Sequence, residues 1–207
     1  VISLLKDIKS DGSTSATQWA LLGSSYSSLK QNKKAMAVYD NWIEIQPKQR
    51  LAWVNKASLQ EHLTDYVGAL TTVEKALIEA PDDSQFSILR AHYLILTKKF
   101  NQAQMQISSL SNEQLRLPLV QGLQAKIWLT EGKLQQALSG LEGLYNLLPS
   151  PYNAALLFSS YRRLGQEEIA FSFIQKHIEF FPADNITRQL LAESAITYNK
   201  PLAKQHY

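Results

Sequence analysis

Small residues recur along this chain at a fixed interval, and this repeat constrains the fold more than any other feature. Alanines stand 34 residues apart at Ala35, Ala69, Ala103 and Ala137, and the series continues at an interval of 33 with Ala170 and Ala203. Twelve residues after the alanines come Pro47, Pro81, Pro149 and Pro182, with Leu115 in the place of one missing proline. An ordinary helical bundle does not predict such a register, whereas an array of stacked repeats does.

Each repeat is expected to hold two amphipathic helices of about 13 residues, such as 16–29 and 33–46, joined by a short polar turn. The proline that follows has no N–H and biases the residue before it away from helix, so it separates one pair from the next. One pair cannot bury its own apolar face, but a stack of pairs can. The sequence therefore predicts an all-α chain built as an α-solenoid of helix pairs.

The first repeat carries a motif that resembles the tetratricopeptide repeat (TPR): Trp19, Leu22, Gly23, Tyr26, Ala35, Tyr39 and Pro47. This resemblance implies a right-handed superhelix of antiparallel helix pairs, with a concave groove lined mainly by the first helix of each pair. Of the residues that clamp acidic chaperone tails in some family members, only Asn55 has a match. The drifting Gln- and Ser-rich copies look more like a piece of a bacterial envelope TPR lipoprotein of the PEP-CTERM or exopolysaccharide type.

The repeat register predicts the organisation of the whole chain. Residues 1–15 are expected to be the end of an upstream repeat helix followed by a Ser-rich turn, and 184–207 an incomplete sixth repeat, as in a piece cut from a longer chain. Between them five repeats are expected, at 16–49, 50–83, 84–117, 118–150 and 151–183.

No set of residues in the sequence predicts catalysis, a metal site or a cofactor. The chain has no cysteine, and its four histidines are far apart without ligands at metal-binding spacing. His177 takes a position that a packed residue usually fills, so a place in the core or at the groove edge is expected. No Gly-rich phosphate loop or Gly-x-Ser-x-Gly elbow occurs. A net charge of +3 is too small to indicate nucleic acid, and the apolar runs are too short for a membrane span.

Repeat positions that face the concave side in the resembled family define a candidate partner-binding groove. It changes from small and polar, through apolar, to basic, and its residues are Asn55, His62, Gln85, Ile88, His92, Leu123, Lys126, Tyr152, Arg162, Arg163 and Arg188. A peptide with apolar anchors and an acidic patch would complement such a groove. Alternatively, Ile88 and Leu123 pack only between helices and the arginines are solvated. Exposure of Ile88, Leu119 and Leu123 as one apolar strip would favour peptide binding, whereas burial there would favour the spacer.

The function expected from these features is a non-enzymatic protein interaction scaffold that binds a protein or peptide in its groove, within a bacterial envelope assembly. The alternative is a solenoid segment that acts as a spacer or self-associates, with no ligand in its own groove. A glycan-binding enzyme accessory would need exposed aromatics, for which Tyr152 is the one clear groove candidate. The absence of cysteine leaves both periplasm and cytoplasm open, and truncated terminal helices can make a piece of a solenoid dimerise.

Overall fold

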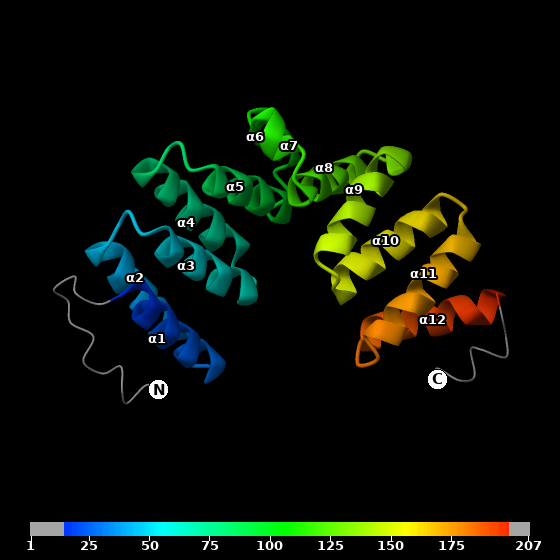
Figure 1. Ribbon diagram of the computed structural model, residues 1–207, viewed down its shortest axis with the longest axis horizontal. Coiled ribbons are helices and arrows are strands. Elements are labelled where there is room, and N and C mark those ends of the chain that lie inside the picture. Colours follow the sequence, from blue (N-terminus) through cyan, green and yellow to red (C-terminus); the bar gives the residue numbers. More distant parts are fainter. Residues whose placement is uncertain (1–14, 199–207) are drawn as a thin grey trace. The chain divides into compact units, whose positions relative to one another are not determined.

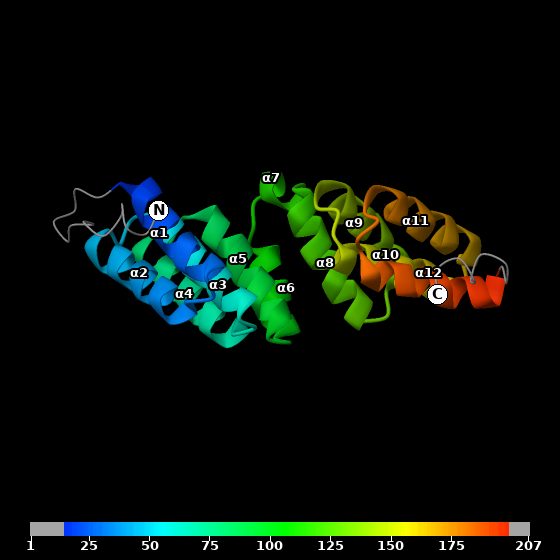
Figure 2. The same cartoon turned by 90° about the horizontal axis from the view of Figure 1, so that it is seen from below.

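The computed structural model describes residues 15–198, and in this range the chain forms helices and no strands. The helices pack side by side as successive pairs (Figures 1 and 2). The predicted all-α solenoid of helix pairs is thereby confirmed, while the right-handed winding stays a prediction. The expected helix in residues 1–9 and the segment after residue 198 lie outside the described range. The chain divides into two compact units between Leu110 and Ser111.

Unit 1 contains three helix pairs. They are α1 (Ala16–Ser28) with α2 (Asn32–Ile45), α3 (Arg50–His62) with α4 (Tyr66–Glu79), and α5 (Ser84–Leu96) with α6 (Phe100–Ser108). Each first helix packs on its own partner, and α3 also packs against α1 and α2.

Unit 2 begins with the short α7 (Asn112–Leu115) and then contains two pairs and a single helix. The pairs are α8 (Pro118–Thr130) with α9 (Leu134–Leu147), and α10 (Pro151–Arg163) with α11 (Glu167–Phe180). The chain continues into α12 (Asn185–Tyr198), which packs against α10 and α11.

The third predicted repeat differs from the others because its second helix, α6, has only nine residues. Ser109 Oγ donates to the carbonyl of Gln106 at 2.7 Å, and Ser111 Oγ accepts from the backbone N–H of Gln114 in a capping box that starts α7. Serine side chains compete in this way for the backbone hydrogen bonds that would continue a helix. The boundary between the two units falls at this break, inside the expected repeat 84–117.

A left-handed residue follows the first helix of every complete pair, at the same place in each. These residues are Lys30, Thr64, Lys98, Gly132 and Gly165, with φ between 57° and 77°. In each case the next N–H donates back into the helix, as Gln31 N does to the carbonyl of Tyr26 at 2.9 Å. This is the Schellman ending, which satisfies carbonyls that the helix leaves unpaired.

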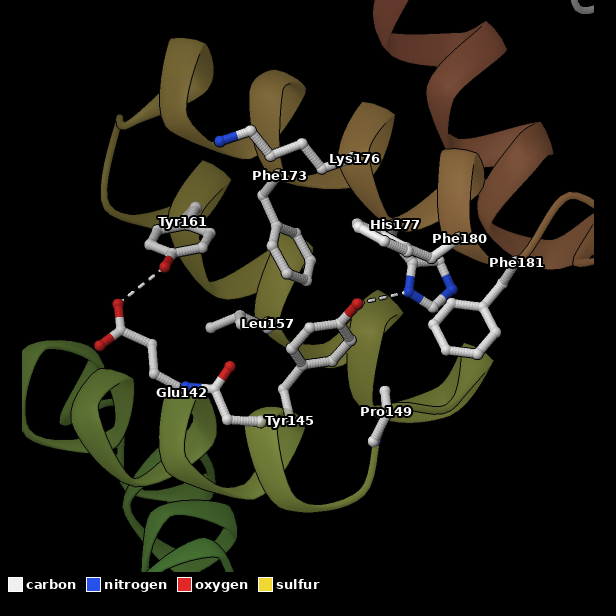
Figure 3. A pocket seen from close by; sticks show the side chains of 11 residues that line it. Glu142, Tyr145, Pro149, Leu157, Tyr161, Phe173, Lys176, His177, Phe180 and Phe181 are labelled. Carbon is white, nitrogen blue, oxygen red and sulfur yellow. Dashed lines mark hydrogen bonds between the residues drawn. The ribbon is translucent and has the colours of Figure 1, made fainter.

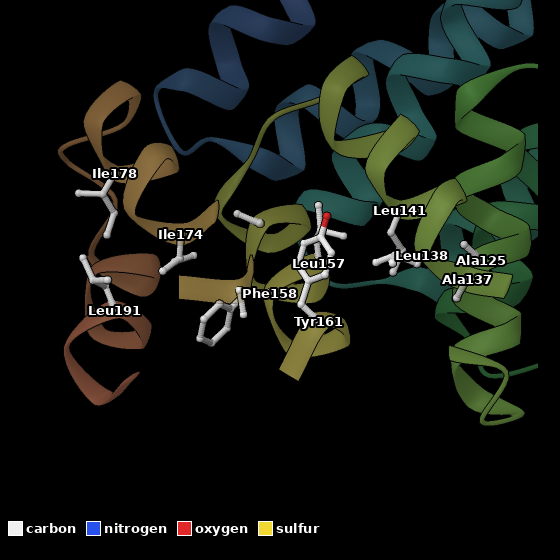
Figure 4. Close-up of a cluster of buried hydrophobic side chains, with 12 residues drawn as sticks. Ala125, Ala137, Leu138, Leu141, Leu157, Phe158, Tyr161, Ile174, Ile178 and Leu191 are labelled. Atoms are coloured by element: carbon white, nitrogen blue, oxygen red, sulfur yellow. The ribbon is translucent and has the colours of Figure 1, made fainter. Parts of the chain in front are cut away.

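The repeat alanines lie at the centre of the packing. Ala35, Ala69, Ala103, Ala137 and Ala170 are completely buried, as their spacing predicts. In unit 1 the stacked rings of Trp19 and Trp42 lie 6.4 Å apart within the core. In unit 2 one cluster extends from α8 to α12 and includes Leu141, Leu157, Ile174 and Leu191 (Figure 4).

Candidate functional site

The groove residues predicted in unit 1 form a mainly polar surface on α3 and α5. His62 and Gln85 are exposed, and Asn55 and His92 are half-buried. Arg50 Nη1 donates to Gln85 Oε1 at 3.4 Å. This surface offers hydrogen-bonding groups rather than apolar anchors.

Glu61 joins two neighbouring side chains of α5 on this surface. Its Oε1 lies 3.1 Å from His92 Nε2, and its Oε2 accepts from the Tyr93 hydroxyl at 3.1 Å. Burial, together with the charge of Glu61 and this hydrogen bond, raises the pKa of Tyr93 far above its ordinary value, so the hydroxyl remains a donor. His92 is therefore already engaged within unit 1.

The apolar middle of the predicted groove does not form an exposed strip, which agrees with the alternative that Ile88 and Leu123 pack between helices and favours the spacer. Ile88 is 8% exposed and Leu123 is 1% exposed, so neither can contact a partner, and Leu119 alone is exposed among the three residues of the expected strip. On α8, Leu123 shares the helix face of Val120 and Ile127, which are also buried. The repeat register alone does not indicate the depth at which neighbouring helices cover these side chains.

Most of the basic side chains predicted at the C-terminal end of the groove are at least partly exposed. The Lys126 ammonium lies 5.2 Å from the ring centroid of Tyr152, which is 61% exposed. Arg162 is exposed and its Nε lies 3.0 Å from Glu167 Oε2, while Arg163 is exposed beside it. Arg188 is half-buried and donates to the carbonyl of Pro182 in the preceding turn. Lys126 and Tyr152 meet at the start of α10, whereas Arg162 and Arg163 stand at its end, about 15 Å further along the helix. We call these four residues, on the first helices α8 and α10, the basic surface.

A cleft that the sequence reasoning missed lies elsewhere in unit 2, between the second helices α9 and α11, with α10 contributing to its wall (Figure 3). It encloses about 660 Å³ and none of the predicted groove residues lines it. We call it the aromatic cleft, and its lining residues are Glu142, Tyr145, Asn146, Pro149, Leu157, Tyr161, Phe173, Lys176, His177, Phe180 and Phe181.

Aromatic rings make up most of the cleft wall. The ring of Phe173 meets that of Tyr145 edge-on at 4.9 Å and is tilted against that of Tyr161 at 6.0 Å. At the other end Phe181 stacks on His177 at 4.7 Å, and Phe180 is 78% exposed at the rim. The sequence signal was the group of aromatic residues in the second helices of the fourth and fifth repeats. The resemblance to the TPR family, by contrast, implies binding mainly by the first helix of each pair.

A chain of hydrogen bonds holds the base of the cleft. Tyr145 Oη lies 2.6 Å from His177 Nδ1, and His177 Nε2 lies 2.9 Å from Asp184 Oδ2. The expected core position of His177 is confirmed, since this residue is 1% exposed. Asp184 Oδ1 also accepts from the N–H groups of Ile186 and Thr187 and so caps α12.

The ionisation of Asp184 sets the direction of its hydrogen bond with His177. Burial alone would raise its pKa, but hydrogen bonds from Thr187, His177 and Ile186 prevail and lower it below the usual value. An ionised carboxylate can only accept, so His177 Nε2 carries the hydrogen. The other ring nitrogen, Nδ1, is hydrogen-bonded to the Tyr145 hydroxyl.

Glu142 lies at the opposite end of the cleft from Phe181 (Figure 3). Its Oε1 accepts from the Tyr161 hydroxyl at 2.7 Å. Burial, followed by this hydrogen bond and the charge of Glu142, raises the pKa of Tyr161 strongly. The hydroxyl therefore stays protonated and fixes the carboxylate at the cleft rim.

Within residues 15–198, no group of three or more His, Asp or Glu side chains is placed to hold a metal ion. Among the described helices, none combines the length and apolar character needed to cross a membrane.

These features define a helical-repeat solenoid, a class of fold that generally serves as a protein interaction scaffold. Residues 18–49 match the family model of the tetratricopeptide repeat. The match covers the first helix pair, and over the rest of the chain the likeness to solved TPR structures is one of fold. A comparison with curated proteins found no match.

Three solved structures illustrate the likeness of fold. Cut9, in the APC/C hetero-tetramer Cut9–Hcn1, is 14% identical with a TM-score of 0.78; the alignment covers 99% of this chain and 40% of Cut9. TTC0263, a TPR protein of Thermus thermophilus, is 16% identical with a TM-score of 0.70, over 88% of this chain and 100% of the other. YrrB, a TPR protein with an unusual peptide-binding site, is 16% identical with a TM-score of 0.53, over 91% and 95%. This chain thus spans less than half the length of Cut9.

Proposed function

We propose that this chain is a non-enzymatic scaffold that binds an acidic segment of a partner protein on the basic surface of unit 2. The observation that carries the proposal is the exposure of Arg162 and Arg163 at the end of α10, together with the Lys126–Tyr152 pair. Complementary charge guides association and selects the partner. The TPR fold is typical of such scaffolds, and the likeness of fold to the peptide-binding YrrB is consistent with this role.

The side chains of the basic surface suit an acidic peptide in different ways. The Lys126 ammonium is held over the Tyr152 ring, so one cation and one large amphipathic ring stand together. Arg162 pairs with an exposed carboxylate, and surface pairs of this kind are weak enough for a partner carboxylate to compete. A guanidinium can bind a carboxylate through two parallel hydrogen bonds.

The apolar anchors first expected of the partner have no counterpart at Leu123, because that side chain is buried. The proposed ligand of this surface is therefore acidic and polar. The competing function, a spacer or self-associating segment, predicts that this surface binds no peptide.

A titration with a defined peptide tests the proposal. The probe is a short fluorescein-labelled peptide of alternating Glu and Ser, with a Gln and Ser peptide as its neutral counterpart, and the readout is fluorescence anisotropy. We expect the acidic peptide alone to bind, and Arg163→Glu to weaken binding by about fivefold or more. Lys75→Glu makes the same charge change at an exposed position of α4 in unit 1 and should leave binding unchanged. Equal binding by both variants would contradict the proposal.

We also propose that the partner belongs to a bacterial envelope assembly. This part rests on the drifting, Gln- and Ser-rich repeats that the sequence shares with envelope proteins of the TPR type. Fractionation of the source cells tests it: recovery of the native protein with the envelope or periplasmic fraction is expected, and recovery in the cytoplasm alone would contradict it.

A further inference from the structure

The aromatic cleft of unit 2 is open to a ligand and is separate from the basic surface. Its volume of about 660 Å³ falls in the range of sites that bind small ligands or peptide side chains, about 300–1,000 Å³. Phe180 is 78% exposed beside it, and Pro149 and Phe181 are also exposed. Exposed apolar side chains grouped around a concavity mark interaction sites more often than single ones do.

We propose that this cleft is a second docking site, which takes an aromatic or leucine side chain of a partner peptide with a basic residue next to it. The wall dictates the anchor, because Tyr145, Phe173 and Tyr161 present ring faces and edges that suit an apolar or aromatic group. The one buried polar chain of the wall, from Tyr145 through His177 to Asp184, is already satisfied internally. The apolar part of the wall therefore requires no polar partner from the ligand.

The position of Glu142 is the reason for proposing a basic residue next to the apolar anchor of the peptide. Tyr161 holds the carboxylate through Oε1, and no ion pair of the described residues involves Glu142. Its Oε2 is thus available at the end of the cleft opposite Phe181 (Figure 3). A carboxylate fixed in this way is a preorganised acceptor for a lysine or arginine of the ligand.

Lys176 is a positively charged group at the rim of the cleft, but it does not reverse the preference of the cleft for a basic residue of the ligand. Its side chain is exposed on α11, across the cleft from Glu142 (Figure 3). A flexible, solvated ammonium is screened by water and salt, whereas the Glu142 carboxylate is half-buried and hydrogen-bonded. An acidic neighbour on the ligand would meet the fixed carboxylate at short range and be repelled.

The test uses this chain and short acetylated, fluorescein-labelled peptides of Ser and Gly with a central Phe-Lys, Ala-Lys, Phe-Gln or Phe-Glu pair. The readout is fluorescence anisotropy. We expect the Phe-Lys peptide to bind best, with a loss of about tenfold or more for Ala-Lys and about fivefold for Phe-Gln. Phe-Glu should be the weakest of the three phenylalanine peptides.

Substitutions on the protein side locate the site. Phe180→Ala should weaken every phenylalanine peptide, while Ile169→Ala, which removes another exposed apolar side chain of α11 outside the cleft, should leave binding unchanged. Glu142→Gln keeps an acceptor for Tyr161 and should weaken Phe-Lys without weakening Phe-Gln. A loss of stability would affect both peptides equally and so would not produce this difference.

Three outcomes would overturn the proposal. The first is binding that does not depend on Phe180 or on the phenylalanine of the peptide. The second is a preference for Phe-Glu that Lys176→Gln removes, which would mean an acidic partner. The third is a dimer in sedimentation experiments that Phe180→Ala dissociates, which would mean that a second copy of this chain covers the cleft. Arg163→Glu should leave binding of Phe-Lys unchanged, so failure of the cleft is distinguishable from failure of the basic surface.

Discussion

The Nε2 atom of His177 lies 2.9 Å from Oδ2 of Asp184, and both side chains are almost fully buried. This pair joins α11 to the start of α12, because the other carboxylate oxygen of Asp184 accepts from backbone N–H groups there. The last described helix of unit 2 is therefore held by a charged, hydrogen-bonded contact as well as by apolar packing.

Removal of this carboxylate should destabilise unit 2. Asp184→Ala leaves the His177 N–H and the first N–H groups of α12 without a partner, and we expect a loss of about 2–4 kcal/mol in the free energy of unfolding. Urea denaturation followed by circular dichroism measures this loss. Asp82→Ala, at an exposed site before α5, is the matched control and should cost far less. Equal effects would contradict the role given to Asp184.

The same carboxylate should make the stability depend on acid. Since the folded-state pKa of Asp184 lies below its ordinary value of 3.8, its contribution is complete above about pH 5 and is lost as the pH falls through the folded-state pKa. Asp184→Asn should therefore lose less stability than the wild type between about pH 5 and pH 2. If the stability of both proteins changed equally with pH, Asp184 would have the same pKa in the folded and unfolded states, and the prediction would be contradicted.

Two glycines of α9 should respond in opposite directions to alanine. A Cβ at Gly140 would lie 2.6 Å from the carbonyl oxygen of Gln121 on α8, so Gly140→Ala forces the helices apart and should cost about 1–3 kcal/mol or more. At Gly143 the nearest atom would be 3.9 Å away, and Gly143→Ala should stabilise by about 0.5–1 kcal/mol. Urea midpoints of the two variants test the close approach of α8 and α9, and a tolerated Gly140→Ala would refute it.

Replacement of Thr64, which has a left-handed backbone conformation, should increase the stability of unit 1. Its φ of 60° is unfavourable for a β-branched residue, so Thr64→Gly should stabilise unit 1 by about 1 kcal/mol. Gly132 holds the same place after α8, and a Cβ there would meet nothing within 4 Å. Gly132→Ala should therefore destabilise unit 2 by about 1 kcal/mol through backbone strain alone. Thermal denaturation measures both changes, and a loss of stability in Thr64→Gly would contradict this assignment.

Truncation of Leu123 distinguishes a core residue from a groove residue. Leu123→Ala should cost about 2–5 kcal/mol because the side chain is 1% exposed, whereas Leu119→Ala, at 36% exposure, should cost much less. Chemical denaturation provides the measurement. Similar small losses of stability in both variants would indicate that Leu123 lies on the groove surface rather than in the core.

The repeat register predicted the stacking because the regular spacing places a small residue at the same point of each second helix, where the partner helix packs. Ala35 and Ala137 stand in different units, yet both are completely buried at the expected place. The third helix pair is less regular at Ser109 and Ser111, whose side chains hydrogen-bond the backbone between α6 and α7.

The candidate sites were predicted less well, because they depend on how deeply neighbouring helices cover a side chain. Arg163 and Tyr152 are exposed as expected, but Leu123, which was assigned to the same concave face, is buried. The aromatic cleft needs contacts between residues 32 positions apart, such as Tyr145 and His177. No local pattern in the sequence reports such a contact.

Photo-crosslinking of the acidic peptide tests the central claim, binding of a partner segment on the basic surface, most directly. The Glu and Ser peptide would carry one benzophenone group, and mass spectrometry would identify the crosslinked residues. We predict crosslinks within α8 and α10, around Lys126, Tyr152 and Arg163, that disappear in Arg163→Glu and persist in Lys75→Glu. Crosslinks confined to unit 1 or to the aromatic cleft, or unchanged in Arg163→Glu, would contradict it.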